Sequence, residues 1–301
     1  MIRGGYGIYY LLLERFGSED QLALNPPFLV QTTASIPVSV KTPAFLLQNG
    51  FPSTWLNPAD INYQLTHIRA VQPNAGTPYV QEWSFGVQRE LIPQTVFSVN
   101  YIGSKSTHLD YLTDQNQLVN GAKPYPNFGY IESQFAEGNA VYHALATSVN
   151  RRFSKGLALG ISWTWSKSID DTPEELESNS GGSQNGYNQS SWRGPSDFDF
   201  PQRVVASYVW DLPFGKGQPW LNNGVAAAIL GGWRTSGIYT FASGRPFTVV
   251  SGSTYSTAID LYGAATAVPN VIGTPQIIGN VNCWFYQSTN AACRATVLWL
   301  P

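Results

Sequence analysis

The sequence predicts an all-β fold, specifically an incomplete segment of a large transmembrane antiparallel β-barrel. Three observations support this prediction: strands with one apolar and one polar face, a composition poor in charge, and connections of two very different lengths. Only 12% of the 301 residues are charged, against about 25% in average soluble domains, and 14% are aromatic. A barrel with lipid outside and water inside needs this balance, because half of each strand must be apolar and half polar.

The clearest predicted strand covers Leu157–Ser166. Its odd-numbered positions are large and apolar, and its even-numbered positions are small and mostly polar. This alternation predicts a long amphipathic strand between two different solvents, and about ten residues is the length of a tilted membrane-spanning strand. The same pattern predicts further strands at Ile2–Leu13, Tyr79–Leu91, Thr95–Ser104, Tyr142–Phe153, Arg203–Leu212 and Trp233–Ala242.

The connections between these strands differ in length. Residues 91–94 and 153–156 are tight turns, and Pro213–Leu230 is longer and has room for a short helix. The segment after the first strand, Lys105–Val141 and Lys167–Gln202 are predicted to be long loops. Long loops count against a compact soluble domain, whereas an outer-membrane barrel combines short periplasmic turns with longer extracellular loops.

Aromatic residues near the strand ends are the predicted membrane-interface residues. Trp and Tyr gather at both interfaces because their rings are apolar while the N–H or O–H group needs a wet partner. The predicted extracellular set is Trp83, Tyr101, Trp163 and Trp165, and the predicted periplasmic set is Trp210 and Trp233.

A second hypothesis is a soluble, secreted all-β carbohydrate-binding module. In that protein the Trp residues would line a glycan cleft, and one face of each strand would meet a second sheet. Strands of about ten residues exceed the five or six usual in globular sheets, which argues against this alternative. The two hypotheses differ in whether the protein is soluble without detergent.

Other function classes find little support in the sequence. The net charge is −2 with no basic stripe, so nucleic acid is not an expected partner. The three histidines, His67, His108 and His143, lack metal-ligand spacing, and no Gly-x-Ser-x-Gly nucleophile elbow occurs. We therefore expect no enzyme activity, no cofactor and no metal site. A hydrolase embedded in the barrel would need a His and acid pair at the extracellular rim, which the spacing does not indicate.

Taken together, several stretches within residues 1–250 resemble the large barrel of TonB-dependent receptors, in particular the Oar-like group. The matching stretches are Ile2–Tyr10, Gln81–Arg89, Asn100–Ser104, Tyr142–Leu145, Arg151–Leu157, Trp163–Ser168, Gly194–Asp199 and Gly231–Tyr239. Asp197, Asp199 and Arg203 lie in or beside one of them, just before a strand. We interpret these three residues as a loop-to-strand anchor in which Arg203 pairs with a carboxylate.

The resemblance implies an outer-membrane protein of a Gram-negative cell that takes up or binds a large ligand, of siderophore, glycan or peptide class, with energy supplied through TonB. Its direct partner is then outer-membrane lipid. TonB is expected only through the family's plug, which has no counterpart in this chain. Family barrels have about 22 strands, and about seven are predicted here. No export signal follows Met1, so we expect the chain to be part of a longer protein.

The chain divides into a predicted barrel-wall segment with extracellular loops, residues 1–250, and a poorly assigned continuation, residues 251–301. The continuation contains both cysteines, Cys283 and Cys293. In an exported protein a short spacing of this kind favours a disulfide that closes a small loop. Two free thiols are the alternative.

Overall fold

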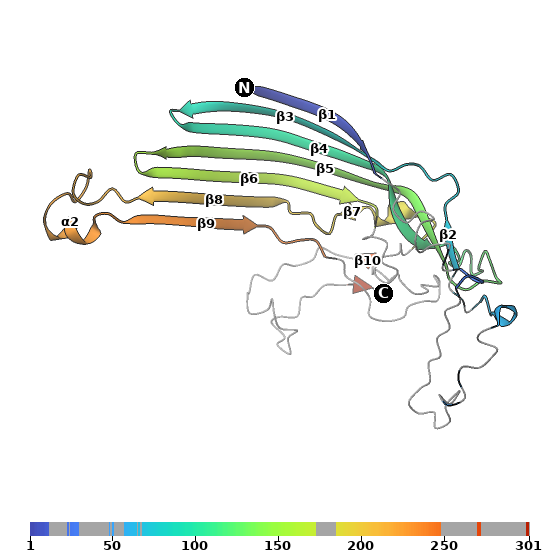
Figure 1. The fold of residues 1–301 in the computed structure, drawn as a ribbon. Helices are drawn as coiled ribbons and strands as arrows, with labels where there is room; N and C mark the ends of the chain where they lie inside the picture. The colour runs from blue at the N-terminus through green and yellow to red at the C-terminus, as the bar shows by residue number, and fades with distance from the viewer. Residues whose placement is uncertain are drawn as a thin grey trace.

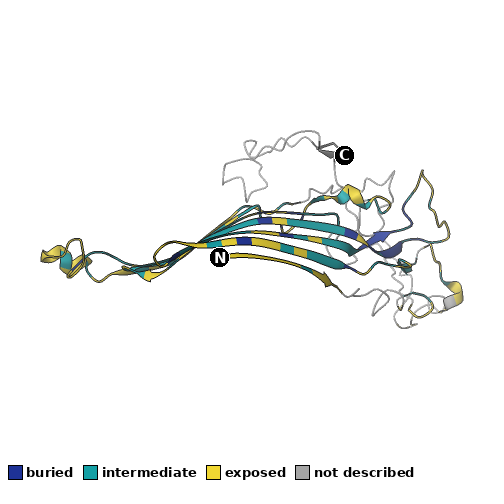
Figure 2. Cartoon of the chain, turned by 90° about the horizontal axis from the view of Figure 1, so that it is seen from above, coloured by how far each residue is buried: buried dark blue, intermediate teal, exposed yellow. Residues whose placement is uncertain are grey.

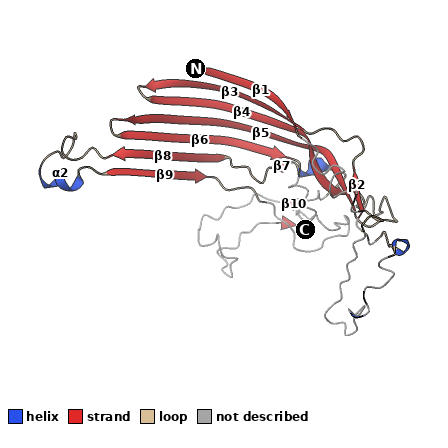
Figure 3. Cartoon of the chain, viewed as in Figure 1, coloured by secondary structure: helices blue, strands red, loops and turns tan. Residues whose placement is uncertain are grey.

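The protein forms one open, curved sheet of long antiparallel strands, shown in a computed structural model (Figure 1). The structure describes residues 1–11, 25–29, 57–64, 68–172 and 185–247, together with a few single positions and two short C-terminal strands. Helix is confined there to short pieces, and strands make up nearly all the regular structure (Figure 3). The prediction of an all-β fold is confirmed.

Seven long strands follow one another across the sheet in the order β1-β3-β4-β5-β6-β8-β9. All seven predicted strands are found. Their bounds are β1 (Ile2–Tyr10), β3 (Tyr79–Ile92), β4 (Thr95–Asp114), β5 (Ile131–Ser154), β6 (Leu157–Asp170), β8 (Gln202–Asp211) and β9 (Arg234–Ala242). We call this set of strands the wall. Each strand pairs antiparallel with the next, as in an up-and-down barrel.

The wall has a turn end and a loop end (Figure 1). At the turn end, β3 is joined to β4 through Pro93 and Gln94, and β5 is joined to β6 through Lys155 and Gly156. Lys155 and Gly156 both have positive φ, 50° and 78°, which is the geometry of a two-residue hairpin that follows strand twist. The third connection, which has room for a short helix, contains α2 (Gly224–Leu230). All longer connections lie at the loop end.

The strands β4 and β5 extend well beyond their neighbours at the loop end, which corrects the predicted loop over Lys105–Val141. We call residues 109–114 and 131–138, together with β2 (Ile68–Val71), the extension. β2 pairs parallel with β5 and takes the place beside it that β6 leaves after Asp170. A bulge at His108, whose φ is 61°, separates the extension from the wall.

The remaining elements are short. Strand β7 (Gly194–Pro195) pairs with the end of β6, and the 3-10 helices η2 (Pro58–Asp60) and η3 (Gln189–Trp192) lie in loop-end connections. β7 and η3 both fall within the predicted loop Lys167–Gln202. In the C-terminal region β10 (Asn270–Val271) pairs with β11 (Trp299–Leu300). Cys283 and Cys293 lie outside the described residues.

None of the described helices has the length and apolar character needed to cross a membrane.

Candidate functional site: the two faces and the loop end of the wall

One face of the wall is apolar from strand to strand. The register aligns Phe85, Tyr101, Leu145 and Trp165 in one row. The next row contains Ile2, Val87, Val99, Trp163, Val204 and Phe241. Phe85, Trp165 and Phe241 are more than half exposed, although they are large and apolar. A face of this kind is stable against lipid and not against water, so we call it the lipid face.

The opposite face carries small polar residues at the same level. The register places Gln88, Ser98, Ser148 and Ser162 in one row, and Asn100 and Thr164 in the next. The hydroxyls of Ser98 and Ser148 are 2.6 Å apart and hydrogen-bonded, and the Asn150 amide donates to Ser148 at 3.3 Å. These small polar side chains therefore hydrogen-bond to one another along the face. We call this the lumen face.

The predicted interface aromatics all lie on the lipid face. Trp83 is held over Gly103, because a Cβ at that position would lie 2.4 Å from the indole ring. The Tyr101 hydroxyl is hydrogen-bonded to Nδ1 of His143 at 2.8 Å, and their rings stack at 6.1 Å. The Trp163 indole donates to Gln202 at 2.6 Å. These polar groups therefore have partners, while the level of the membrane boundary stays a prediction.

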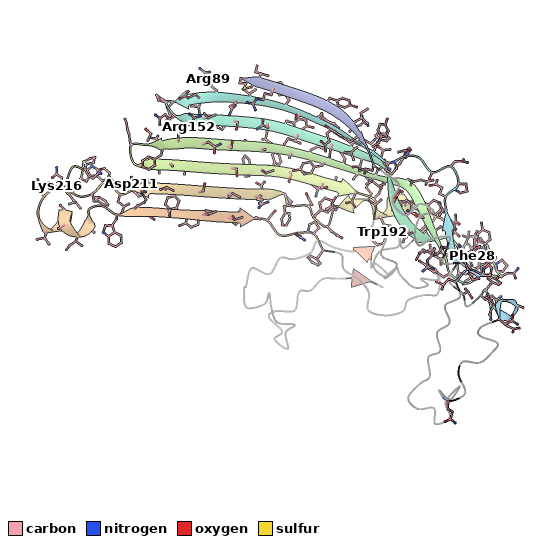
Figure 4. All side chains as sticks on the ribbon, viewed as in Figure 1. Phe28, Arg89, Arg152, Trp192, Asp211 and Lys216 are labelled. Carbon is pink, nitrogen blue, oxygen red and sulfur yellow. The ribbon has the colours of Figure 1, made fainter. Side chains whose placement is uncertain are left out.

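Trp210 and Trp233 lie near the turn end of the lipid face. Trp210 pairs with Thr235 of β9, and Trp233 continues the alternation two residues earlier. The Trp233 indole donates to the backbone oxygen of Ile229 in α2 at 2.8 Å. Asp211 and Lys216 also lie at this end, whereas Phe28 and Trp192 lie at the loop end (Figure 4).

Burial in the described structure is concentrated toward the loop end (Figure 2). The buried apolar residues of the extension are Tyr111, Leu112, Ile131 and Ala136. Its buried polar residues are Thr113, Asp114, Glu132, Ser133 and Gln134, and Asn116 and Gln117 follow directly. The extension is therefore a small packed core that lies beyond the predicted membrane-spanning part of the wall. Without the extension, each wall strand still has at least nine residues, about the length that a tilted strand needs to cross lipid.

Asn116 organises the connection between β4 and β5. Its side-chain nitrogen lies 2.7–3.0 Å from the backbone oxygens of Tyr125, Phe128 and Gly129, and its side-chain oxygen accepts from the Tyr125 amide at 2.9 Å. Asn116 is fully buried. A side-chain amide that hydrogen-bonds both to backbone N–H groups and to backbone carbonyls of one loop fixes the conformation of that loop. The loop over residues 117–130 is thus tied to the end of β4.

Acidic side chains of the extension are held by specific partners. Asp114 accepts from the backbone amides of Asn116 and Ile131, at 2.8 and 3.1 Å. Glu132, which is buried, lies 3.4 Å from the Arg69 guanidinium of β2. Because burial disfavours its charged form, the pKa of Asp110 is raised from 3.8 to about 6, and a hydrogen bond from Gln134 partly opposes this shift. Burial likewise raises the pKa of Tyr130.

The predicted loop-to-strand anchor contains one residue with clear contacts. Asp199 is buried, accepts from the Ser168 backbone amide at 2.9 Å, and pairs with Lys167 at 2.9 Å. Asp197 is exposed. In the described part of the chain it is Lys167, and not Arg203, that pairs with Asp199. Arg203 instead lies on the lumen face, opposite Thr164 and Ala242.

The described histidines have no acid partner that would indicate catalysis. His108 lies with Nδ1 3.3 Å from the Thr77 backbone oxygen, and His143 contacts Tyr101 and Trp83. His67 lies outside the described residues. Among the residues with described placement, no three His, Cys, Asp or Glu side chains gather as metal ligands. The expectations of no enzyme activity, no cofactor and no metal stay predictions.

Comparison with protein-family models identifies a family that this chain matches. The family model described as "Outer membrane beta barrel domain" matches residues 1–296, which is nearly the whole chain. A search of curated proteins found no match.

Proposed function

The chain belongs to the outer membrane β-barrel domain family, and we propose that it forms part of the barrel wall of a TonB-dependent receptor that binds or takes up a large ligand. Family membership places the protein in the outer membrane and replaces the hypothesis of a soluble secreted module. The receptor function goes beyond that membership. It rests on the resemblance of the motifs within residues 1–250 and on the lumen face.

The small side chains of the lumen face carry the proposal. Barrels of about eight strands fill their interior with side chains, whereas 22-stranded transporters enclose a lumen wide enough for a plug. Here the lumen-face rows consist mainly of serine, threonine, asparagine and alanine, including Ser98, Ser148 and Ser162. Seven wall strands are in place and the sheet is still open, with β1 and β9 at its edges. Both features fit a wide barrel.

The extension supports a role in ligand binding at the cell surface. A packed unit held by Asn116 and Asp114 presents the loop between β4 and β5 in one conformation. Binding residues are commonly placed on loops that a rigid scaffold positions. We propose that this loop contributes to the ligand site, that the TonB contact is made by a plug, and that the chain itself catalyses no reaction.

The experiment is a binding measurement with the full-length gene product that contains residues 1–301. The purified product in detergent is titrated with the isolated periplasmic domain of TonB, and binding is followed by interferometry. We expect saturable binding that is lost when the TonB-contacting segment of the plug is deleted. An intact product that does not bind the TonB domain would overturn the receptor proposal and leave the outer-membrane barrel assignment in place.

A further inference from the structure

The connection between β8 and β9 differs from the other two described turns. Those turns need two residues each, whereas this one runs from Leu212 to Trp233 and includes α2. Its exposed large apolar residues are Trp220, Leu221, Val225, Ile229, Leu230 and Trp233. A connection this apolar at the end of a barrel would be costly in water, since large exposed apolar patches on soluble surfaces mark interaction sites.

The connection is a folded unit. The Gly215 amide donates to the Trp220 carbonyl at 3.2 Å, and the Trp220 amide donates to the Pro213 carbonyl at 3.1 Å. Gly215 has a φ of 104°, and a Cβ there would lie 2.4 Å from the Cα of Gly231. Two backbone segments therefore touch at a point where only glycine fits. This contact closes the connection around the base of α2.

The apolar surface is continuous with the lipid face. Trp233 continues the lipid-face alternation of β9, is 62% exposed, and donates its indole N–H to Ile229 of α2. Leu212 donates its backbone amide to the Trp233 carbonyl at 2.8 Å, which extends the ladder to the start of the connection. The side chains of α2 thus adjoin a surface that meets lipid.

We propose that residues 212–233 form an interfacial foot, in which α2 lies in the periplasmic leaflet of the outer membrane beside the wall. The α2 sequence Gly224–Leu230 carries no charge, and Val225 and Ile229 are 76% and 63% exposed. Lys216, which precedes α2 in the same connection, supplies a positive charge that can interact with anionic headgroups. Interfacial helices bury an apolar face at the boundary between headgroups and acyl chains.

The occupant of this surface is phospholipid, and the continuity with the lipid face is the reason. A periplasmic protein or a second copy of the chain would need a separate apolar patch, set apart from the membrane. The proposal requires only that the protein is an outer-membrane barrel with its short turns on the periplasmic side. It does not depend on TonB or on any ligand.

Photocrosslinking of the full-length protein in cells tests the foot. p-Benzoylphenylalanine replaces Val225 or Ile229 in separate variants, both at exposed positions where the added bulk has space. Phe241, on the lipid face of β9, is the positive control, and Asn222, an exposed polar residue of the same connection, is the negative control. After irradiation, adducts are identified by mass spectrometry, and heat-dependent gel mobility confirms that each variant is folded.

We expect phospholipid adducts at positions 225 and 229 in yields close to that at position 241 and well above that at position 222. The proposal is overturned if positions 225 and 229 give no lipid adduct while position 241 does. It is equally overturned if they crosslink to another protein or to a second copy, or if the adduct is lipopolysaccharide, which occupies the opposite leaflet.

Discussion

Replacement of Asn116 by Ala is expected to release the loop between β4 and β5. The Asn116 amide contacts three backbone carbonyls, but its NH2 group carries two hydrogens, so it satisfies two of them at a time, and its oxygen accepts one further bond. The substitution therefore removes about three hydrogen bonds in a fully buried site. Each group left without a partner there costs about 1–3 kcal/mol.

The low end of that range is appropriate, because water can enter the space that the amide leaves. It gives a loss of about 3 kcal/mol in the free energy of local opening, since three groups lose about 1 kcal/mol each. A loss of that size corresponds to about a hundredfold faster exchange, at 1.4 kcal/mol for each factor of ten. Hydrogen exchange of the Tyr125 and Phe128 amides measures it directly in the purified, folded protein.

Asn127→Ala is the matched control for this experiment. Asn127 lies in the same loop, has the same side chain, and is exposed. We expect its replacement to leave the exchange rates within a few-fold of the unmodified protein. If Asn116→Ala and Asn127→Ala give the same rates at both amides, the loop is held by other contacts and the reasoning about Asn116 is wrong.

Three further predictions concern other parts of the wall. Asp199→Ala should speed exchange of the Ser168 amide by about ten- to a hundredfold, because that amide loses its acceptor at a cost of about 1–3 kcal/mol, whereas exposed Asp197→Ala should not. Since the folded pKa of Asp110 is about 6 and its unfolded value is 3.8, the extension should lose stability as pH rises between these values; Asp110→Asn should abolish this slope in pH-dependent exchange. Ser148→Cys should react with a charged maleimide that enters the lumen, and Thr147→Cys, one residue away on the lipid face, should stay unlabelled; the reverse pattern would show that the two faces are exchanged.

The strands of the wall could be predicted because their alternation has a simple physical origin. Leu157–Ser166 separates large from small residues with period two, and β6 begins at Leu157. The turns could be predicted as well. Only Lys155 and Gly156 separate β5 from β6, and two residues are enough for a tight hairpin between adjacent antiparallel strands. In strands whose two faces each meet a single solvent, the alternation in the sequence therefore agrees with the observed register.

The extension could not be predicted, because its burial follows no alternation in the sequence. Glu132, Ser133 and Gln134 are all buried, and a polar run of this kind is typical of a loop. They form a strand because β4 lies on one side and β2 on the other. The bulge at His108 interrupts the alternation, and β2 comes from a distant part of the chain. For the same reason, the residues next to Asn116 in the sequence did not indicate its role.

The interpretation of the loop-to-strand anchor did not include Lys167, which pairs with Asp199 in the structure, and the difference has a physical reason. Sequence proximity suggested an ion pair between Arg203 and a nearby carboxylate. However, the segment before β8 continues alongside β6, which brings Asp199 to the Ser168 amide and to Lys167. Contacts across a sheet depend on register, which depends in turn on how the two strands are joined.

The bulge at His108 has a consequence for how this protein changes over evolutionary time. A bulge accommodates extra residues without shifting the pairing that precedes it, and here Thr107 remains opposite Asn139 while Asp110 lies opposite Ala136. Insertions and deletions beyond this point therefore leave the side chains that face lipid where they were. Surface regions of the protein can diversify, lengthen or be exchanged between lineages, while the part that must be inserted into the membrane keeps its pattern.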